Sequence, residues 1–178
     1  EISKKIDSAP VGIVVASDSS DNTDKICKQF DNVKVLNSKN IGLGYAMYSG
    51  LKEALKFNTE YICSIDSDGQ VDLNEIEVFF KEIEKGENHL ILGSRFLGKD
   101  LIKYDYKILN NIGTKLLRFM INSKTNLNIT DSHGGIRIMK SDIVKKLKII
   151  GDHTYVQETI IDAVENGYKV KEIESKWL

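Results

Sequence analysis

Short apolar runs alternate with segments of helical spacing along the first half of the chain, and this alternation limits the folds available to it. The runs are residues 11–16, 33–36, 61–65 and 89–93, and helical patterns cover residues 22–30, 46–55 and 76–83 between them. Strands joined by helices of this length need right-handed crossovers, which place successive strands parallel. The pattern predicts an α/β protein with a mainly parallel sheet flanked by helices.

Local signals set the expected boundaries of several elements. Asp72, with Glu75 three residues later, predicts a capping-box start for the third helix. Residues 101–121 have helical spacing, residues 134–139 predict a strand, and Ser141 is expected to cap a helix. A helix over residues 155–165 is expected to end at Asn166-Gly167, before a last strand at residues 168–173.

Composition narrows the class of protein. A chain of 178 residues with 41% hydrophobic content fits one globular domain. Its net charge of -1 gives no basic footprint, so we expect no nucleic-acid partner. Cys27 and Cys63 lie among apolar residues without metal-ligand spacing, which predicts reduced core thiols and a cytoplasmic setting. No stretch approaches the roughly 20 apolar residues of a membrane span, so we expect a soluble or peripheral chain.

Polar side chains follow three successive predicted strands, at the edge where ligands bind in open α/β sheets. They are Asp18, the Lys39-Asn40 turn and the run Asp66-Ser67-Asp68. Two carboxylates one residue apart suit a hard cation such as Mg²⁺ or Mn²⁺, and Gln70 offers a further oxygen. The alternative is a surface turn, because Asp, Ser and Gly favour turns for local reasons.

Gly42 and Gly44 open a helix after a strand, a pattern that also occurs in dinucleotide-binding folds. The third glycine of that pattern would fall at Met47, however. The two glycines therefore more simply indicate a tight turn and close packing of the helix.

Several motifs resemble, in order, those of family 2 glycosyltransferases of the GT-A type. Asp66-Ser67-Asp68-Gly69-Gln70 and Gly93-Ser94-Arg95 resemble the DxDxQ and GSR motifs of enzymes similar to dolichyl-phosphate mannosyltransferase. Further matches are residues 18–23 (D-x-S-x-D-x-T), residues 40–46 (N-x-G-x-G-x-A), Asp131 with residues 135–137 (D…GFR), Glu158, and Glu172-Ile173. The resemblance implies a GT-A fold and a single catalytic domain over residues 1–178, without the family's first strand and C-terminal continuation.

The same resemblance implies a function and a set of site residues. The implied reaction is metal-dependent, inverting transfer of a sugar from a UDP- or GDP-sugar to polyprenyl or dolichyl phosphate, at the cytoplasmic face of a membrane. Metal ligands would be Asp66, Asp68 and Gln70, and donor contacts would come from Asp18, Lys39, Asn40, Asp66, Gln70 and Arg95. Catalytic residues would be Asp68, Arg95, Lys107 and Arg137, the last two holding an acceptor phosphate.

Several alternatives stay open. The acceptor could be a hydroxyl group, and nucleotidyl transfer or a non-catalytic nucleotide-binding module would also use paired acids. Arg95 could form a surface salt bridge instead of a phosphate contact, and Glu158 could act as a base, orient Arg137 or join a local network. His133 could touch a substrate or serve as a polar loop residue. Residues 101–121 could be a core helix with a basic edge or a helix at a membrane surface beside an anionic lipid.

Overall fold

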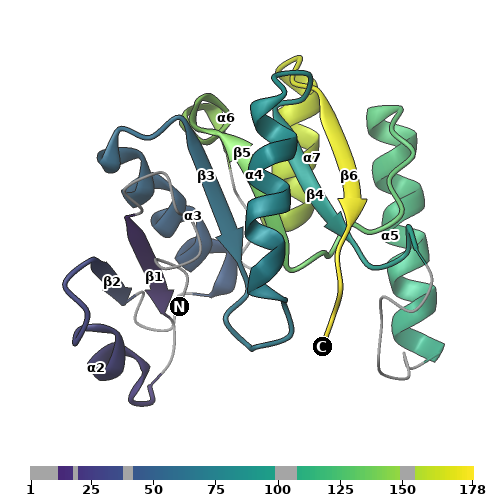
Figure 1. The fold of residues 1–178 in the computed structure, drawn as a ribbon. Helices are drawn as coiled ribbons and strands as arrows, with labels where there is room; N and C mark the ends of the chain where they lie inside the picture. The colour runs from purple at the N-terminus through teal and green to yellow at the C-terminus, as the bar shows by residue number, and fades with distance from the viewer. Residues whose placement is uncertain (1–11, 18–19, 38–41, 99–107, 149–154) are drawn as a thin grey trace.

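The computed structural model describes residues 12–17, 20–37, 42–98, 108–148 and 155–178. In chain order its elements are β1 (Ile13–Ser17), α2 (Thr23–Cys27), β2 (Val33–Asn37), α3 (Leu43–Ala54), a 3-10 helix (Leu55–Phe57), β3 (Tyr61–Ile65), a second 3-10 helix (Leu73–Glu75), α4 (Ile76–Glu84), β4 (Leu90–Ser94), α5 (Ile108–Thr125), β5 (Ile136–Lys140), α6 (Ser141–Lys146), α7 (Tyr155–Glu165) and β6 (Val170–Glu174). Figure 1 shows these elements as strands with helices on both sides, which confirms the predicted α/β class.

The strands form two sheets. β1 and β2 pair in parallel, and the second sheet has the order β3-β5-β4-β6. β4 and β6 are parallel, whereas β5 is antiparallel to both β3 and β4. β3, β4 and β6 therefore run in the same direction, as expected for a mainly parallel sheet, and β5 lies between β3 and β4 in the opposite direction.

The reversed direction of β5 follows from the path of the chain before it. Asp131 lies beside Arg95, immediately after β4, so the chain has already returned to the carboxyl edge of the sheet when β5 begins. Ile136, the first residue of β5, pairs with Ile65, the last residue of β3. β5 can continue only back toward the opposite edge.

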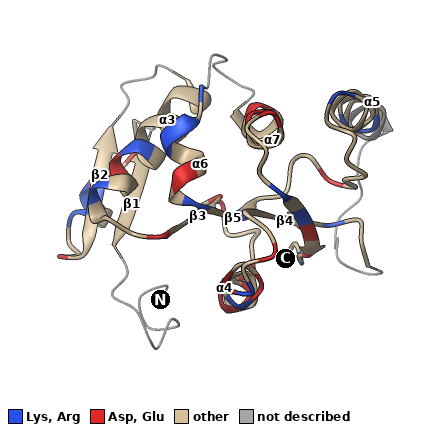
Figure 2. Cartoon of the chain, turned by 90° about the horizontal axis from the view of Figure 1, so that it is seen from above, with Lys and Arg blue, Asp and Glu red and all other residues tan. Residues whose placement is uncertain are grey.

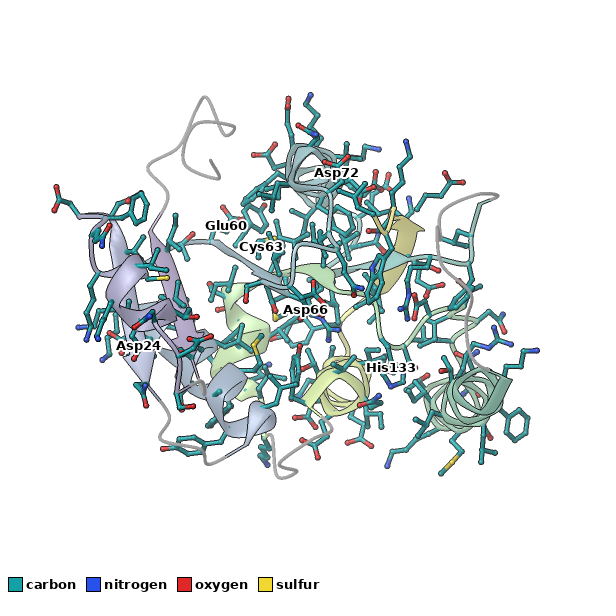
Figure 3. All side chains as sticks on the ribbon, turned by 90° about the horizontal axis from the view of Figure 1, so that it is seen from below. Asp24, Glu60, Cys63, Asp66, Asp72 and His133 are labelled. Atoms are coloured by element: carbon teal, nitrogen blue, oxygen red, sulfur yellow. The ribbon has the colours of Figure 1, made fainter. Side chains whose placement is uncertain are left out.

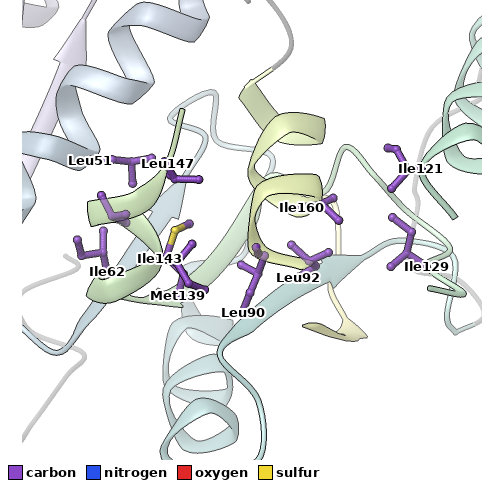
Figure 4. Packing of buried hydrophobic residues seen from close by; sticks show 12 residues of the cluster. Leu51, Ile62, Leu90, Leu92, Ile121, Ile129, Met139, Ile143, Leu147 and Ile160 are labelled. Carbon is purple, nitrogen blue, oxygen red and sulfur yellow. The ribbon is translucent and has the colours of Figure 1, made fainter. Parts of the chain in front are cut away.

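The second sheet is covered on both faces. One hydrophobic cluster joins it to α3, α5, α6 and α7, and includes Leu51, Leu90, Leu92, Met139 and Ile160 (Figure 4). The other cluster joins it to α4, whose Phe79 and Ile83 have no exposed surface. Adjacent residues of β4 thus point into opposite clusters, as expected for a strand buried on both faces. Figure 2 shows α4 alone on one side of the sheet and α3, α6 and α7 on the other.

Two of the predicted helices differ in detail, one at its end and one in its cap. The helix expected over residues 22–30 is only Thr23–Cys27, and Asp21 accepts a hydrogen bond from the Thr23 N–H at 2.8 Å. Asp72 caps a 3-10 turn by accepting from the Asn74 N–H, but Glu75 does not close a capping box. The Glu75 carboxylate instead accepts hydrogen bonds from the Ser175 hydroxyl at 2.6 Å and the Lys176 N–H at 2.7 Å, because β6 ends beside it.

α5 lies along the β6 side of the molecule and covers the later part of the predicted helix at residues 101–121; residues 101–107 lie outside the described residues (Figure 1). Ile121 is buried in the core, and the Asn122 amide exchanges two hydrogen bonds with the Ile129 backbone at 2.9 and 3.0 Å. In the described part of the chain, no helix is both long enough and apolar enough to cross a membrane.

A cleft of about 2000 Å³ separates the two sheets. Its walls are β1 on one side and β3 on the other, and residues of α3 and α4 line it above and below. α3 packs against both sheets, and so closely on β1 that a Cβ on Gly50 would lie 2.9 Å from the Ala16 Cβ. β1 and β3 thus face each other across the cleft without pairing.

Candidate active site

The Asp66-Ser67-Asp68 loop lies where β3 ends, at one end of this cleft. The Asp66 N–H donates to the Gly135 carbonyl at 2.9 Å, which fixes the start of the loop against β5. Asp68 is exposed, and its Oδ1 accepts a hydrogen bond from the Gln70 N–H at 3.0 Å. Gly69 has a φ of 80°, which favours glycine, and a Cβ there would meet no atom within 4 Å. The loop is therefore tightly turned and open on its outer side.

Asp66 is half-buried at the centre of this edge of the sheet (Figure 3). Burial raises the pKa of its carboxyl group, the nearby Asp68 charge raises it further, and the positive charges of Arg137 and Arg95 oppose the rise. A partly desolvated carboxylate with a second carboxylate close by favours the arrival of a cation.

Two adjacent glycines let β5 approach the loop. A Cβ on Gly135 would lie 3.1 Å from Asp66 Oδ2 and 2.9 Å from Val71 Cγ2. A Cβ on Gly134 would lie only 1.8 Å from the Gly93 carbonyl oxygen, a distance that no real side chain allows. The chain crosses the end of β4 here, so side chains at these positions would push β5 away from Asp66.

Arg95 is paired with Asp131 in the interior. Arg95 Nε donates to Asp131 Oδ2 at 2.6 Å and Arg95 Nη2 donates to Oδ1 at 2.9 Å. Arg95 is 3% exposed and Asp131 1% exposed. The alternative of a surface salt bridge is therefore wrong, because the pair is buried. The guanidinium group of Arg95, which we expected at the donor phosphates, binds the Asp131 carboxylate instead.

Two further residues enclose this ion pair. The Glu172 carboxylate accepts from the N–H groups of Thr130 at 2.6 Å and Asp131 at 2.8 Å. Burial raises the pKa of Glu172, and these hydrogen bonds oppose the rise. The Trp177 ring centre lies 4.1 Å from the Arg95 guanidinium carbon, and the Trp177 backbone forms an antiparallel β-bridge with Val71, just after the Asp66–Asp68 loop. β6 and the segment after it thus hold the loop and the ion pair together.

Arg137 lies in β5 opposite Ser64 and is 3% exposed. Its Nη2 donates to the Gly134 carbonyl at 3.2 Å, its Nη1 donates to the Val156 carbonyl at 3.4 Å, and its guanidinium carbon lies 5.5 Å from the Tyr155 ring centre. Arg137 is thus held in place by backbone carbonyls and an aromatic ring, with its charge felt at Asp66.

His133 lines the same cleft as Asp66 and lies on the side toward α5 (Figure 3). Its Nε2 lies 2.7 Å from Gln157 Nε2, and its Nδ1 lies 2.9 Å from the Ser132 hydroxyl. Burial lowers the pKa of His133, and the charges of Arg95 and Arg137 lower it further while Asp131 opposes them. The imidazole is therefore suited to hydrogen bonding as the neutral ring.

The structure brings together Asp66, Asp68, Gln70, Arg95 and Arg137, all at one edge of the second sheet. The other expected site residues, Asp18, Lys39, Asn40 and Lys107, lie outside the described residues. Sequence reasoning missed Trp177, Tyr155 and Gln157 as parts of the site. A signal existed for Trp177, because it is the only tryptophan in the chain and lies three residues after the final strand.

The donor set fits Mg²⁺ or Mn²⁺. Asp66, Asp68 and Gln70 offer hard oxygen atoms, and the space beyond Gly69 is open. Among the described residues no group of three or more His, Cys, Asp and Glu side chains could enclose a metal ion. The two carboxylates and the amide of Asp66, Asp68 and Gln70 would leave coordination positions for the phosphate oxygens of a ligand, as is usual for Mg²⁺.

Comparison with known families decides the class of the protein. The model of Glycosyl transferase family 2 matches residues 5–148. The chain belongs to glycosyl transferase family 2. The matched range includes both the Asp66–Asp68 loop and the Gly93-Ser94-Arg95 motif.

Two curated relatives have related sequences. An uncharacterized protein of Methanocaldococcus jannaschii is 31% identical over 169 residues, covering 92% of this chain and 68% of that protein. The UDP-N-acetylglucosamine–dolichyl-phosphate N-acetylglucosaminyltransferase of Methanococcus voltae is 25% identical over 154 residues, covering 76% of this chain and 60% of that protein. The chain thus spans about two thirds of the length of these relatives.

Solved structures confirm the GT-A fold. Glucosyl-3-phosphoglycerate synthase from Mycobacterium tuberculosis, in complex with phosphoglyceric acid, superposes with a TM-score of 0.66 at 12% identity, over 92% of this chain and 57% of that one. The UDP complex of the same enzyme gives a TM-score of 0.59 at 14% identity, over 86% and 55%. At these identities the likeness concerns the fold alone.

Proposed function

We propose that this family 2 protein is a metal-dependent, inverting glycosyltransferase that uses a UDP- or GDP-sugar as donor and a polyprenyl or dolichyl phosphate as acceptor. The observation that carries the proposal is the pair Asp66 and Asp68 at the end of β3, lining the cleft beside the buried cation Arg137. The acceptor oxygen forms a bond to the anomeric carbon of the sugar while the bond to the donor diphosphate breaks, and the nucleoside diphosphate leaves.

In this proposal Asp66, Asp68 and Gln70 would hold Mg²⁺ or Mn²⁺ where the donor diphosphate binds. The metal would neutralise the charge that develops on the leaving diphosphate. Asp18, Lys39 and Asn40 are proposed to contact the nucleotide, as the family motifs imply. Arg95 contributes by fixing Asp131, which also accepts a hydrogen bond from the His133 N–H, because its fork is engaged there.

A lipid phosphate is the proposed acceptor for a chemical reason. A phosphate monoester is largely ionised at neutral pH, since its second pKa is about 6, and so needs cations more than a base. Lys107 and Arg137 are the proposed cations. The relative from Methanococcus voltae, named for transfer to dolichyl phosphate, supports this acceptor and makes UDP the first nucleotide to test.

A hydroxyl acceptor is the second candidate, and His133 is the observation that favours it. A sugar hydroxyl must lose a proton before it attacks, and this needs a base near the anomeric carbon. His133 lines the cleft with Asp66, and its lowered pKa keeps the imidazole neutral at pH 7. Transfer that survives replacement of His133 by Asn would exclude it as that base.

We also propose that one further strand completes the catalytic domain between β1 and β3. The space between them is bounded by the facing edges of these strands and by side chains of α3 and α4. It suits a strand buried on both faces.

The proposed lipid acceptor places the reaction at a membrane, and we propose that it takes place at the cytoplasmic face.

Calorimetric titration with UDP and with GDP, each with and without Mn²⁺, tests the donor proposal. We expect binding of one nucleotide in the presence of Mn²⁺ and at least about tenfold weaker binding in EDTA, because two carboxylates face the diphosphate without the metal. Equal binding with and without the metal would refute the proposed metal site. Release of pyrophosphate rather than UDP or GDP during turnover would identify a nucleotidyltransferase instead.

A further inference from the structure

The chain after β6 runs beside the connection between β3 and α4, which contains the Asp66–Asp68 loop (Figure 1). We call residues 175–178 the strap. The Ser175 N–H donates to the Ser94 carbonyl at 2.9 Å, which extends the pairing of β6 with β4. A Cβ on Gly93 would lie 2.9 Å from the Ser175 Cβ, so the strap crosses closely over the end of β4. The strap therefore begins in the interior, where Ser175 is buried.

The strap pairs with the chain just after the Asp66–Asp68 loop. Trp177 and Val71 form an antiparallel bridge, and the Leu178 N–H donates to the Gln70 carbonyl at 3.0 Å. The Gln70 N–H donates in turn to Asp68 Oδ1 at 3.0 Å. The peptide groups of Gln70 thus join the strap on one side to the Asp68 carboxylate on the other.

The two ends of the loop are held by different elements. The start is held by β5, because the Asp66 N–H donates to the Gly135 carbonyl. Beyond that point Asp68 is exposed, and a Cβ on Gly69 would meet no atom within 4 Å. Carboxylates that bind metals are usually oriented by hydrogen bonds from outer residues, and the strap supplies such support at the far end of this loop.

Glu75 anchors the strap. Its Oε2 accepts from the Ser175 hydroxyl at 2.6 Å and its Oε1 accepts from the Lys176 N–H at 2.7 Å, so both carboxylate oxygens bind consecutive strap residues. Burial raises the pKa of this half-buried carboxyl group, and the two hydrogen bonds oppose the rise. A charged acceptor forms stronger hydrogen bonds than a neutral one. The Glu75 side chain makes no capping hydrogen bond to α4, so its contacts are directed to the strap.

We infer that Glu75 is a positioning residue for the metal site: it anchors the strap, the strap holds Gln70, and Gln70 orients Asp68 toward the cation. The inference rests on the proposed metal-dependent function and adds a residue that touches neither metal nor donor. A residue that only stabilised the fold would affect nucleotide binding equally with and without the metal. A positioning residue affects only the part of the affinity that the metal contributes.

Calorimetric titration with UDP and with GDP, each in Mn²⁺ and in EDTA, tests the inference on three proteins. Glu75→Ala removes both acceptors of the strap. It should raise the nucleotide Kd in Mn²⁺ at least about tenfold, the usual effect of losing an outer partner of a metal ligand, and leave the Kd in EDTA unchanged. Glu75→Gln should stay within about threefold of the unchanged protein, because its amide oxygen still accepts from Lys176 and its NH₂ group can donate to the Ser175 hydroxyl. Both changes remove the same charge, so the difference between them isolates the hydrogen bonds.

Hydrogen exchange in EDTA, without nucleotide, tests the anchor independently of the metal. Backbone amides of residues 66–71 and 177–178 should exchange faster in Glu75→Ala than in Glu75→Gln or the unchanged protein. Glu77→Ala is the matched control, because Glu77 lies on α4, pairs with Lys81 and has a side chain that is 59% exposed. It should leave the exchange and both Kd values unchanged. If Glu75→Ala does not fold, Ser175→Ala replaces it, since it removes one of the two hydrogen bonds and should give a smaller change of the same kind.

The outcomes separate this inference from the proposed function. Equal Kd values in Mn²⁺ for Glu75→Ala and Glu75→Gln, or unchanged exchange in Glu75→Ala, would overturn the inference and leave the metal site standing. An equal rise of the Kd in Mn²⁺ and in EDTA would show a purely structural role for Glu75 and also overturn it. If the unchanged protein binds neither nucleotide better in Mn²⁺ than in EDTA, the metal site itself is refuted, and the role of Glu75 with it.

Discussion

Replacing Asp131 by Asn removes the negative charge from the buried pair with Arg95 while keeping the size of the side chain. In the structure the Asp131 carboxylate accepts from Arg95 Nε, Nη2 and N–H at 2.6, 2.9 and 3.2 Å and from the His133 N–H at 3.0 Å. An asparagine offers one oxygen in place of two, and its own NH₂ group would face other donors. The Arg95 charge would then be buried without a counter-charge.

The expected loss in the free energy of unfolding is about 3–5 kcal/mol, the usual cost of removing one partner of a buried ion pair. For a chain of this size, this corresponds to a fall in Tm of roughly 10 °C. Urea unfolding followed by tryptophan fluorescence gives the value directly. Trp177 is the only tryptophan, and its ring stacks on Arg95 at 4.1 Å, so it reports on this region.

Asp142→Asn is the matched control for this measurement. Asp142 pairs with Lys145 at 2.8 Å, but the two side chains are 66% and 60% exposed, so water screens the pair and the expected loss in the free energy of unfolding is close to zero. The double variant Arg95→Met/Asp131→Leu should regain most of the stability lost by Asp131→Asn, because it removes both buried charges. If Asp131→Asn costs no more than Asp142→Asn, the ion pair does not stabilise the fold as argued.

Three further predictions concern the site itself. Asp68→Ala should abolish Mn²⁺-dependent nucleotide binding in calorimetry while leaving the urea midpoint unchanged, because the Asp68 side chain is exposed at the end of a strand; unchanged affinity would remove Asp68 from the metal site. Lys107→Ala and Arg137→Ala should each reduce transfer to polyprenyl phosphate at least about a hundredfold while donor binding is retained, because the anionic acceptor needs cations. Glu158→Gln should reduce transfer much less. If a radiolabelled-sugar assay instead shows a loss for Glu158→Gln and none for the two cation variants, the acceptor is a hydroxyl group. The His133 imidazole should titrate below pH 6.5 by NMR, because burial lowers its pKa. Below pH 6.5 the unfolded chain binds more protons at this residue than the folded chain, so the contribution of His133 to stability falls as the pH drops. Titration at or above pH 6.5 would contradict its burial.

Periodicity predicted the elements well because burial imposes it along a continuous segment. β3 at Tyr61–Ile65 and α7 at Tyr155–Glu165 have the bounds expected from apolar spacing and end signals. The direction of β5 had no such signal. It depends on where the chain lies at Asp131, which is fixed by a contact with a residue 36 positions earlier.

The same limit applies to the site. The position of Asp66 and Asp68 follows from a general rule about strand ends, so the sequence predicts it directly. The partner of Arg95 follows from packing between distant segments, and nothing in the spacing of Arg95 and Asp131 distinguishes an ion pair from a phosphate contact. Likewise, Glu75 has the spacing of a capping box, but the end of β6 supplies better donors from Ser175 and Lys176.

The cleft between β1 and β3 has a consequence for how the protein opens. β1, α2 and β2 contact the remainder of the described structure mainly through α3, whereas β4 is buried between two strands and two helical layers. Backbone amides of β1 and β2 should therefore exchange with deuterium through local unfolding, well before those of β4, which need global unfolding. A strand bound in the cleft would join both halves into one cooperative unit, and the two exchange rates would then converge.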